Sequence, residues 1–239
     1  RFSTLAIGKA RYGIMLREDG CLLDDGTTSR LGERHFLLTT TTANHTAVLE
    51  HLEFQLQVNR SDWDVVLTDV TDQWAQFSIA GPRARQLLQT VMPDADLSSA
   101  AVPFMAALPA RIAGVRGRLF RISFSGELGY EINVPSAYGR TLWERIMAEG
   151  ARYDITPYGT EAMHVLRAEK GYIVVGDETD GTTTPIDVAT SDKARISGSD
   201  SRLNWRIPPS KASRISSRVL PTPEYTIRLP GTPAALAAS

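Results

Sequence analysis

The sequence predicts an α+β fold with antiparallel sheets and packed helices. Short stretches of alternating apolar and polar residues, separated by Gly- and Asp-containing turns, are typical of hairpins. Longer stretches with apolar residues three and four positions apart are typical of amphipathic helices. The two kinds of segment are mixed without the regular strand–helix–strand succession that builds a parallel sheet. The 239 residues suffice for one large domain or two small ones.

The N-terminal region begins with a predicted hairpin. Apolar runs at 12–16 and 21–23 flank the charged turn 17–20, and we expect Asp24-Asp25-Gly26 to end the second run. Another strand is predicted over 35–41. The helix that follows is predicted over 43–56 from one apolar stripe, formed by Val48, Leu49, Leu52 and Leu56.

The clearest strand pattern lies in the middle of the chain. Residues 118–124 and 130–134 alternate on either side of a turn at 125–129, which predicts a second hairpin. Its second strand has two faces, with Tyr130, Ile132 and Val134 on one and Glu131 and Asn133 on the other.

Three helices and one strand surround this hairpin. A strand at 76–80 is followed by Pro82, which we expect at the first position of a helix because its missing N–H costs nothing there. Ser136 is expected to cap the next helix. The last predicted helix covers 160–170, and Gly171 is its expected C-terminal cap.

The C-terminal residues 188–239 differ in composition. They hold eight basic and three acidic residues, nine serines and six prolines. Because prolines interrupt helices and central strands, we expect this tail to be poorly ordered. The alternative is a β segment built on Tyr225-Thr226-Ile227.

Charge and composition exclude several classes of protein. The chain has 26 basic and 27 acidic residues, so no overall positive field would recruit nucleic acid or an anionic membrane. No stretch has the roughly 20 apolar residues that a membrane-spanning helix needs. The single cysteine, Cys21, excludes an intrachain disulfide and is expected to be inert core. The simplest compartment is the cytoplasm.

Two carboxylates are candidates for chemistry. Asp25 lies in Asp24-Asp25-Gly26, which is either a turn or a carboxylate placed at the end of a strand as a general base or a stabiliser of positive charge. Glu131 lies either on a solvated sheet face or against a planar pair of N–H donors, such as those of a pterin ring, which a carboxylate binds strongly.

Other motifs give little support for a functional site. Residues 176–181 are similar to a calcium loop, but the twelfth position from Asp177 is Val188, where the loop needs Glu. His164, alone on its helix, is expected to pack or form hydrogen bonds. No GxGxxG, Walker A or GxSxG string is present, so a nucleotide-binding domain or a hydrolase nucleophile has no support.

Five strings, in this order, carry a resemblance to a known family: RYGIMLREDGCLLDDG, HFLLTTTTAN, QWAQFSIAGPRAR, FRISFSGELGYEINVP and ITPYGTEAMHVLRAEKGYIVVGDETDGTTTP. They resemble the folate-binding C-terminal part of the alpha subunit of heterotetrameric sarcosine oxidase. That part is itself similar to the aminomethyltransferase, or T-protein, of the glycine cleavage system and to dimethylglycine dehydrogenase. The resemblance covers about residues 2–187.

The resemblance implies a T-protein-like fold and a folate-dependent reaction. A flavin elsewhere in the complex oxidises the N-methyl group of sarcosine to an imine. The one-carbon unit, as imine or formaldehyde, then reaches N5 of tetrahydrofolate, and the products are glycine and 5,10-methylenetetrahydrofolate. Flavin and NAD are expected only in other parts of the complex. The other sarcosine oxidase subunits are the expected partners, with no nucleic acid and no membrane.

The resemblance also implies roles for individual residues. The catalytic aspartate of the family falls on Asp25, which would orient N5 and stabilise iminium charge. The pterin-binding glutamate falls on Glu131, with Glu127 as the less favoured choice. Phe124 would pack near the pterin. An Asn and an Arg that are common in T-proteins fall near Thr41 and on Met163, and these departures favour sarcosine oxidase over the T-protein.

Three lobes surround the folate in the family, and we expect the fold to be incomplete at both ends here. Residues 1–60 would be the remainder of the first lobe, 61–187 the middle lobe, and 188–239 an atypical basic tail for which a frameshift near Asp187 is our hypothesis. Three alternatives remain: a glycine-cleavage aminomethyltransferase, a non-catalytic folate-binding or assembly module, and an inactive fragment.

Overall fold

A computed structural model describes residues 2–188 and 224–228, which form two antiparallel sheets and their covering helices. The five-stranded sheet has the order β1 (Lys9–Leu16), β2 (Leu22–Gly32), β3 (His35–Thr40), β9 (Glu224–Arg228) and β4 (Val66–Asp69). The four-stranded sheet has the order β5 (Trp74–Ala80), β8 (Gly129–Pro135), β7 (Val115–Phe120) and β6 (Ala107–Ile112). The predicted α+β class with antiparallel sheets is therefore confirmed.

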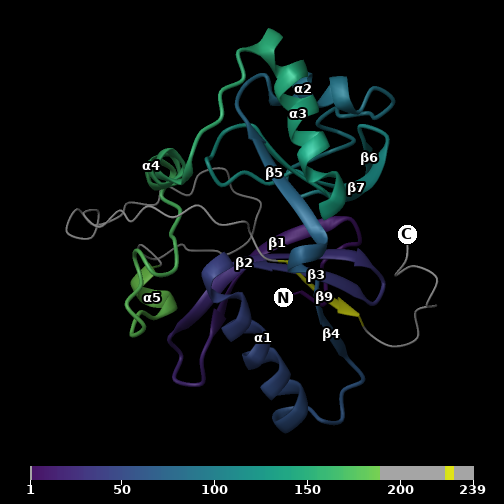
Figure 1. The fold of residues 1–239 in the computed structure, drawn as a ribbon. Coiled ribbons are helices and arrows are strands. Elements are labelled where there is room, and N and C mark those ends of the chain that lie inside the picture. Colours follow the sequence, from purple (N-terminus) through teal and green to yellow (C-terminus); the bar gives the residue numbers. More distant parts are fainter. Residues whose placement is uncertain (1, 189–223, 229–239) are drawn as a thin grey trace.

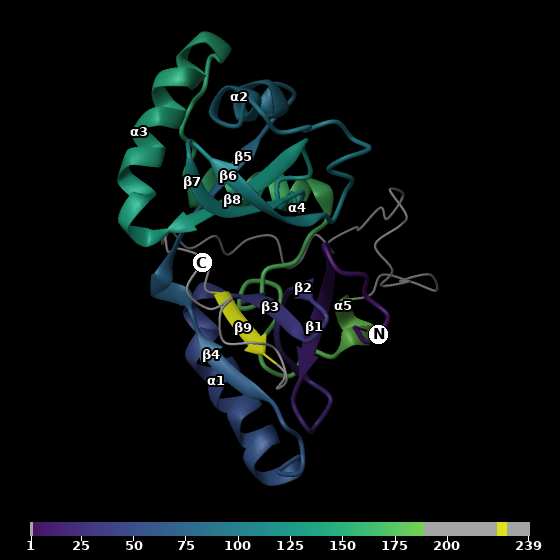
Figure 2. The ribbon, with the colours of Figure 1, turned by 90° about the vertical axis from the view of Figure 1, so that its right-hand side faces the viewer.

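The helices cover the outer sides of the two sheets. In Figures 1 and 2 the helices α2 (Ala84–Val91) and α3 (Gly139–Gly150) lie beyond the four-stranded sheet, and α1 (His45–Phe54) lies beyond the five-stranded sheet. The helices α4 (Thr160–Lys170) and α5 (Pro185–Val188) lie to one side of both sheets. No helix within the described part of the chain has the length and apolar character to cross a bilayer.

Both predicted hairpins form, but two strand boundaries differ. The expectation that Asp24-Asp25-Gly26 ends the strand is wrong, because β2 continues through these residues to Gly32. Gly26 makes this possible: a Cβ there would collide with the carbonyl oxygen of Thr39 on β3. The strand predicted over 118–124 begins at Val115 and ends at Phe120. The backbone of Arg121 forms its hydrogen bonds with Met105 and Ala106, in the loop before β6.

The predicted helices form, but three of them differ at their ends: the helix predicted over 43–56 is α1, which covers His45–Phe54. Pro82 lies before α2, which begins at Ala84, and Ser136 starts a single 3₁₀ turn instead of capping α3. The helix predicted over 160–170 is confirmed as α4, and Gly171 is its left-handed C-cap with φ 82°.

The expectation of poor order is wrong for residues 224–228, where the alternative of a β segment holds: β9 lies between β3 and β4. The remaining expectations for the C-terminal tail, at 189–223 and 229–239, lie outside the described residues.

Three apolar clusters hold these layers together. The outer core lies between the four-stranded sheet and the helices α2 and α3, and it includes Leu88, Val91, Ile132, Val134, Leu142 and Ile146. The inter-sheet cluster joins the two sheets and consists of Ala10, Leu37, Val70, Ala107 and Phe120. A third cluster packs Leu38 of β3 against Val48 of α1.

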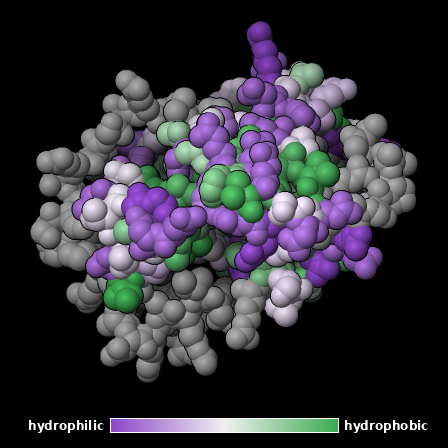
Figure 3. Space-filling view, turned by 90° about the horizontal axis from the view of Figure 1, so that it is seen from below, coloured by the Kyte–Doolittle hydropathy of each residue, from purple (hydrophilic) through white to green (hydrophobic). Residues whose placement is uncertain are grey.

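The surface of the described residues is largely hydrophilic when seen from below, and apolar side chains form separate patches on it (Figure 3). Four large apolar side chains between the end of α1 and β4 are at least half exposed: Phe54, Val58, Trp63 and Val66. This end of the molecule therefore adds little to the core, which lies around the two sheets.

Candidate functional site

Asp25 is a half-buried carboxylate within β2, opposite Ile14 of β1. The phenolic O–H of Tyr12 donates to its Oδ2 at 2.7 Å. Burial raises the pKa of Asp25 to about 6; the Tyr12 hydrogen bond opposes this rise and the nearby Asp24 adds to it. Burial, together with the charge of Asp25, also raises the pKa of Tyr12. The protonation of Asp25 is therefore set by its burial and by the Tyr12 hydrogen bond.

Asp24 is its neighbour in sequence but has a different environment. Its side chain is fully buried and accepts the backbone N–H groups of Asp25 at 2.8 Å and Thr41 at 3.2 Å. Burial raises the pKa of Asp24, and these hydrogen bonds oppose the rise. Asp24 thus joins β2 to the chain that leaves β3, which is a structural role.

Glu131 is the corresponding carboxyl group of the four-stranded sheet. It lies on β8 between Ser78 of β5 and Phe120 of β7. Its Oε2 accepts a hydrogen bond of 3.2 Å from the Gln76 amide, and burial raises its pKa to about 7. The alternative of a solvated face is wrong for this strand, because Asn133 on the same face is fully buried.

The strand registers place both carboxyl groups on the faces where the sheets meet. On β2, Asp25 shares a face with Ser29, whose partners across the sheet are Ala10 and Leu37. Across the four-stranded sheet, Glu131 is paired with Phe120. Ala10, Leu37 and Phe120 all belong to the inter-sheet cluster. Asp25 and Glu131 therefore face the layer between the sheets from opposite sides.

The other three predicted site residues, Phe124, Thr41 and Glu127, make contacts with residues other than Asp25 and Glu131. The ring of Phe124 stacks on Tyr172, with centroids 6.3 Å apart and planes 11° from parallel. Thr41 contributes its backbone N–H to Asp24. Glu127 is exposed in the turn before β8, and its own N–H is bonded to Ser125 Oγ at 3.4 Å. The structure thus brings Thr41 to Asp24, Phe124 to Tyr172, and Glu127 to the turn surface.

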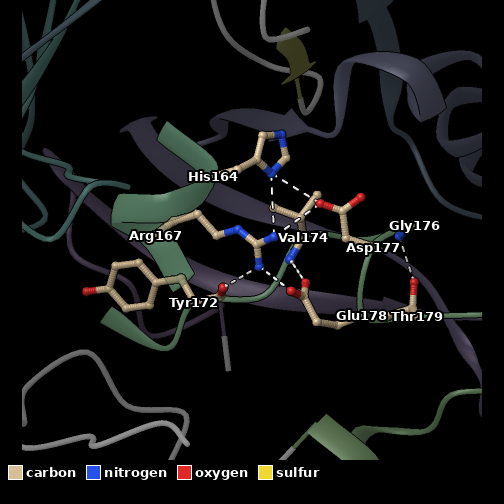
Figure 4. Close-up of polar contacts among 8 residues, drawn as sticks. All are labelled: His164, Arg167, Tyr172, Val174, Gly176, Asp177, Glu178 and Thr179. Carbon is tan, nitrogen blue, oxygen red and sulfur yellow. Dashed lines mark hydrogen bonds and ion pairs between the residues drawn. The ribbon is translucent and has the colours of Figure 1, made fainter. Parts of the chain in front are cut away.

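A buried ionic cluster on α4 was not foreseen from the sequence. Arg167 is 4% exposed, and its guanidinium lies 3.1 Å from Asp177 Oδ2 and is paired with Glu178 (Figure 4). His164 Nδ1 lies 3.1 Å from the same Asp177 oxygen, so its predicted hydrogen-bonding role is confirmed. A usable signal was present, since an arginine among apolar helix residues needs a carboxylate partner and an acidic segment follows it.

Two further polar residues escaped the sequence interpretation. Tyr12 could have been found by counting outward from the hairpin turn to the residues near Asp25, whereas no local pattern singles out Gln76. Cys21 is half-buried with its thiol 3.5 Å from the Thr182 carbonyl, so its assignment to the core is wrong. Across the residues that the structure describes, no group of three or more His, Cys, Asp or Glu could hold a metal ion.

Comparisons with a family model and with known proteins agree on one family. The profile of the GCVT N-terminal domain matches residues 1–192. The sarcosine oxidase subunit alpha of Rhizobium meliloti (strain 1021) is 52% identical over 189 residues, which are 78% of this chain and 19% of that protein. The aminomethyltransferase of Streptomyces avermitilis is 31% identical over 185 residues, covering 77% of this chain and 48% of that protein.

A solved structure agrees with these sequence relatives. The glycine cleavage system aminomethyltransferase T from Bartonella henselae superposes with a TM-score of 0.60 at 26% identity, over 77% of this chain and 47% of that one. The chain thus spans about half the length of the aminomethyltransferases and about a fifth of the sarcosine oxidase subunit.

Proposed function

This chain belongs to the GCVT N-terminal domain family, and from that premise we propose that it binds tetrahydrofolate between its two sheets and transfers a one-carbon unit to it. The observation that carries the proposal is the placement of Asp25 and Glu131 on the two facing sheet surfaces. Tetrahydrofolate, when bound, supplies the nucleophilic N5 that takes up the carbon.

Glu131 is assigned to the pterin ring. Its carboxyl group is half-buried and accepts one hydrogen bond from Gln76, so acceptor capacity remains for a ligand. A carboxylate that receives two parallel N–H donors forms a strong and directional contact. Such donors favour the ionised form, so ligand binding is expected to lower the raised pKa of Glu131. Phe124, stacked on Tyr172, would supply a neighbouring apolar surface, and Thr41 and Glu127 are assigned to the periphery of the site.

Asp25 is assigned to the reacting atoms. Tyr12 holds its carboxylate by one hydrogen bond, which fixes the direction of the remaining lone pairs. A half-buried carboxylate stabilises positive charge that develops near N5 more strongly than one in water, because its surroundings are less polarisable. Asp25 thereby orients the nucleophile and stabilises the charge, and Glu131 holds the ring in register.

The chemistry of sarcosine is the favoured source of the carbon. The 52% identical relative is a sarcosine oxidase subunit. The family resemblance agrees, since it implies that the Arg and Asn common in T-proteins fall on Met163 and near Thr41. In this proposal the carbon arrives as an imine or formaldehyde from the oxidation of sarcosine, and the other sarcosine oxidase subunits are the partners. Flavin and NAD belong to other parts of that complex.

Two measurements test the proposal on the full chain. Calorimetry with tetrahydrofolate reports binding, and formation of 5,10-methylenetetrahydrofolate from formaldehyde, above the rate without protein, reports transfer. We expect Asp25→Ala to lower transfer with binding retained, and Glu131→Ala to weaken binding. Uptake without transfer would make the chain a binding module, and no uptake would refute the proposal.

A further inference from the structure

Arg167 is a buried cation at the end of α4 that the proposed reaction does not use. One terminal nitrogen lies 3.1 Å from Asp177 Oδ2, and the other donates to the Tyr172 carbonyl at 3.0 Å and to the Glu178 carboxylate (Figure 4). Glu178 also accepts the Val174 N–H at 2.8 Å. Burial of a guanidinium is costly unless partners of this kind replace its hydration. Arg167 therefore organises the segment that follows α4, residues 171–184, which we term the strap.

One end of the strap contacts the chain that leads into β8. The Tyr172 ring stacks on Phe124. Just before the strap, the side chain of Lys170, the last residue of α4, lies so close to Gly126 that a Cβ there would collide with it. Both contacts fall in the connection between β7 and β8, a few residues before Glu131. The start of the strap is thus packed against the segment that positions Glu131.

The other end of the strap is bonded to the chain that leads into β2. The Thr183 carbonyl accepts the Leu22 N–H at 2.8 Å, and the Gly181 carbonyl accepts a hydrogen bond from the Arg17 guanidinium. Leu22 is the first residue of β2, three positions before Asp25. One continuous segment therefore joins the first residue of β2, the strand of Asp25, to the connection that leads into β8, the strand of Glu131.

We propose that Arg167 is a positioning residue of the folate site, which holds the strap and so fixes the spacing between Asp25 and Glu131. This inference rests on the proposed function. Arg167 acts through the strap, since its guanidinium contacts Tyr172, Asp177 and Glu178 there; it also contacts His164 on α4 itself. The planar fork of a guanidinium serves acceptors in several fixed directions, whereas a lysine ammonium is a point charge on a flexible stem.

The substitution Arg167→Lys tests this on the full chain, because it keeps the charge and removes the fork. Tetrahydrofolate is expected to bind about tenfold more weakly or worse, since small displacements of positioned groups have large effects. Hydrogen exchange at the Leu22 amide is expected to accelerate, because its acceptor is in the strap. Arg140→Lys is the matched control: Arg140 is exposed on α3 and paired with Glu144, so both readouts should stay as in wild type.

A second measurement separates positioning from a merely structural role. If Arg167 acts by placing Glu131, then Arg167→Lys should change folate affinity less than about twofold when Glu131→Gln is already present, because coupled residues are not additive. An equal loss of affinity in both backgrounds would overturn the inference.

A third variant tests the inference if the Arg167→Lys chain does not fold. Tyr172→Leu leaves the ionic cluster intact and removes the stack on Phe124, and it should also weaken folate binding. Wild-type affinity in a folded Arg167→Lys chain, or in Tyr172→Leu where Arg167→Lys is unfolded, would overturn the inference alone. A wild-type chain that takes up no tetrahydrofolate would instead overturn the proposed function, and this inference with it.

Discussion

The two faces of the four-stranded sheet serve different ends. On the outer face, Ile132 and Val134 are fully buried in the outer core against α2 and α3. On the inner face, Glu131 and Asn133 point toward the five-stranded sheet, and the inter-sheet cluster there has five buried residues. Adjacent residues of one strand therefore belong to different environments. The buried apolar side chains that stabilise the fold lie on one face, and Glu131, whose pKa burial raises, lies on the other.

The largest effect is expected from the outer face. Ile132→Ala removes a fully buried side chain, and the lost burial plus the remaining cavity should lower the free energy of unfolding by about 2–5 kcal/mol. Urea unfolding followed by circular dichroism measures this change. Tetrahydrofolate affinity of the fraction that stays folded should match wild type, and a selective loss of affinity with full stability would contradict the division between the faces.

The neighbouring residue should show the opposite behaviour. Glu131→Gln is expected to weaken tetrahydrofolate binding by about 1.5–3 kcal/mol, the range for a hydrogen bond to a charged group. Because burial raises the pKa of Glu131 to about 7, wild-type affinity should fall as pH drops below about 7, while the variant should show no such dependence. Calorimetry between pH 5.5 and 8.5, a range chosen at roughly 1.5 units around this pKa, measures both effects.

Stability provides the independent control for Glu131. A carboxyl group whose pKa is higher in the folded chain stabilises the protein fully below its unfolded value, 4.5, and this contribution is lost as pH rises through about 7. The stability of wild type relative to Glu131→Gln should therefore decline over that range. A difference that grows with pH would show that Glu131 is ionised within a favourable site before ligand binds.

The pair Asp24 and Asp25 makes the same comparison within the five-stranded sheet. Asp24→Asn replaces an acceptor that serves two backbone N–H groups and should cost about 1–3 kcal/mol of stability. Asp25→Asn keeps an acceptor for Tyr12 and should change stability by less than about 0.5 kcal/mol, while transfer falls about tenfold or more. Thermal unfolding and the methylenetetrahydrofolate assay distinguish them, and exchanged phenotypes would reverse the two assignments.

The sequence predicts the local elements of this molecule well, and the contacts between segments that are distant in sequence poorly. The hairpins, α4 and its Gly171 cap follow from alternation, helical spacing and one permissive glycine, all of which are local. Asp24-Asp25-Gly26 predicts a turn or the end of a strand, whereas its actual position inside β2 depends on Thr39 and Thr41, which lie outside the motif.

The candidate site shows the same limit. The sequence pattern offers Asp25 and Glu131 as candidates and the family resemblance implies their roles, but their placement on facing sheets follows from registers that no single segment encodes. The partners Tyr12 and Gln76 come from neighbouring strands, so their contacts exist only after the strands pair. The position of Arg167 among apolar helix residues predicts carboxylate partners, but the sequence alone does not identify them as Asp177 and Glu178.

The smallest effect is expected at Tyr12, and it tests whether the polar layer tunes Asp25. Tyr12→Phe removes the O–H that stabilises the Asp25 carboxylate, so the pKa of Asp25 should rise further above about 6. A hydrogen bond worth about 0.5–1.5 kcal/mol corresponds to a shift of about one pH unit or less. The acidic limb of the transfer rate should move to higher pH by that amount, while the rate at pH well above the limb changes little. Tyr138→Phe, at a tyrosine that is 49% exposed, is the matched control and should leave the profile in place. An acidic limb that stays fixed in Tyr12→Phe would mean that the ionisation of Asp25 does not govern transfer.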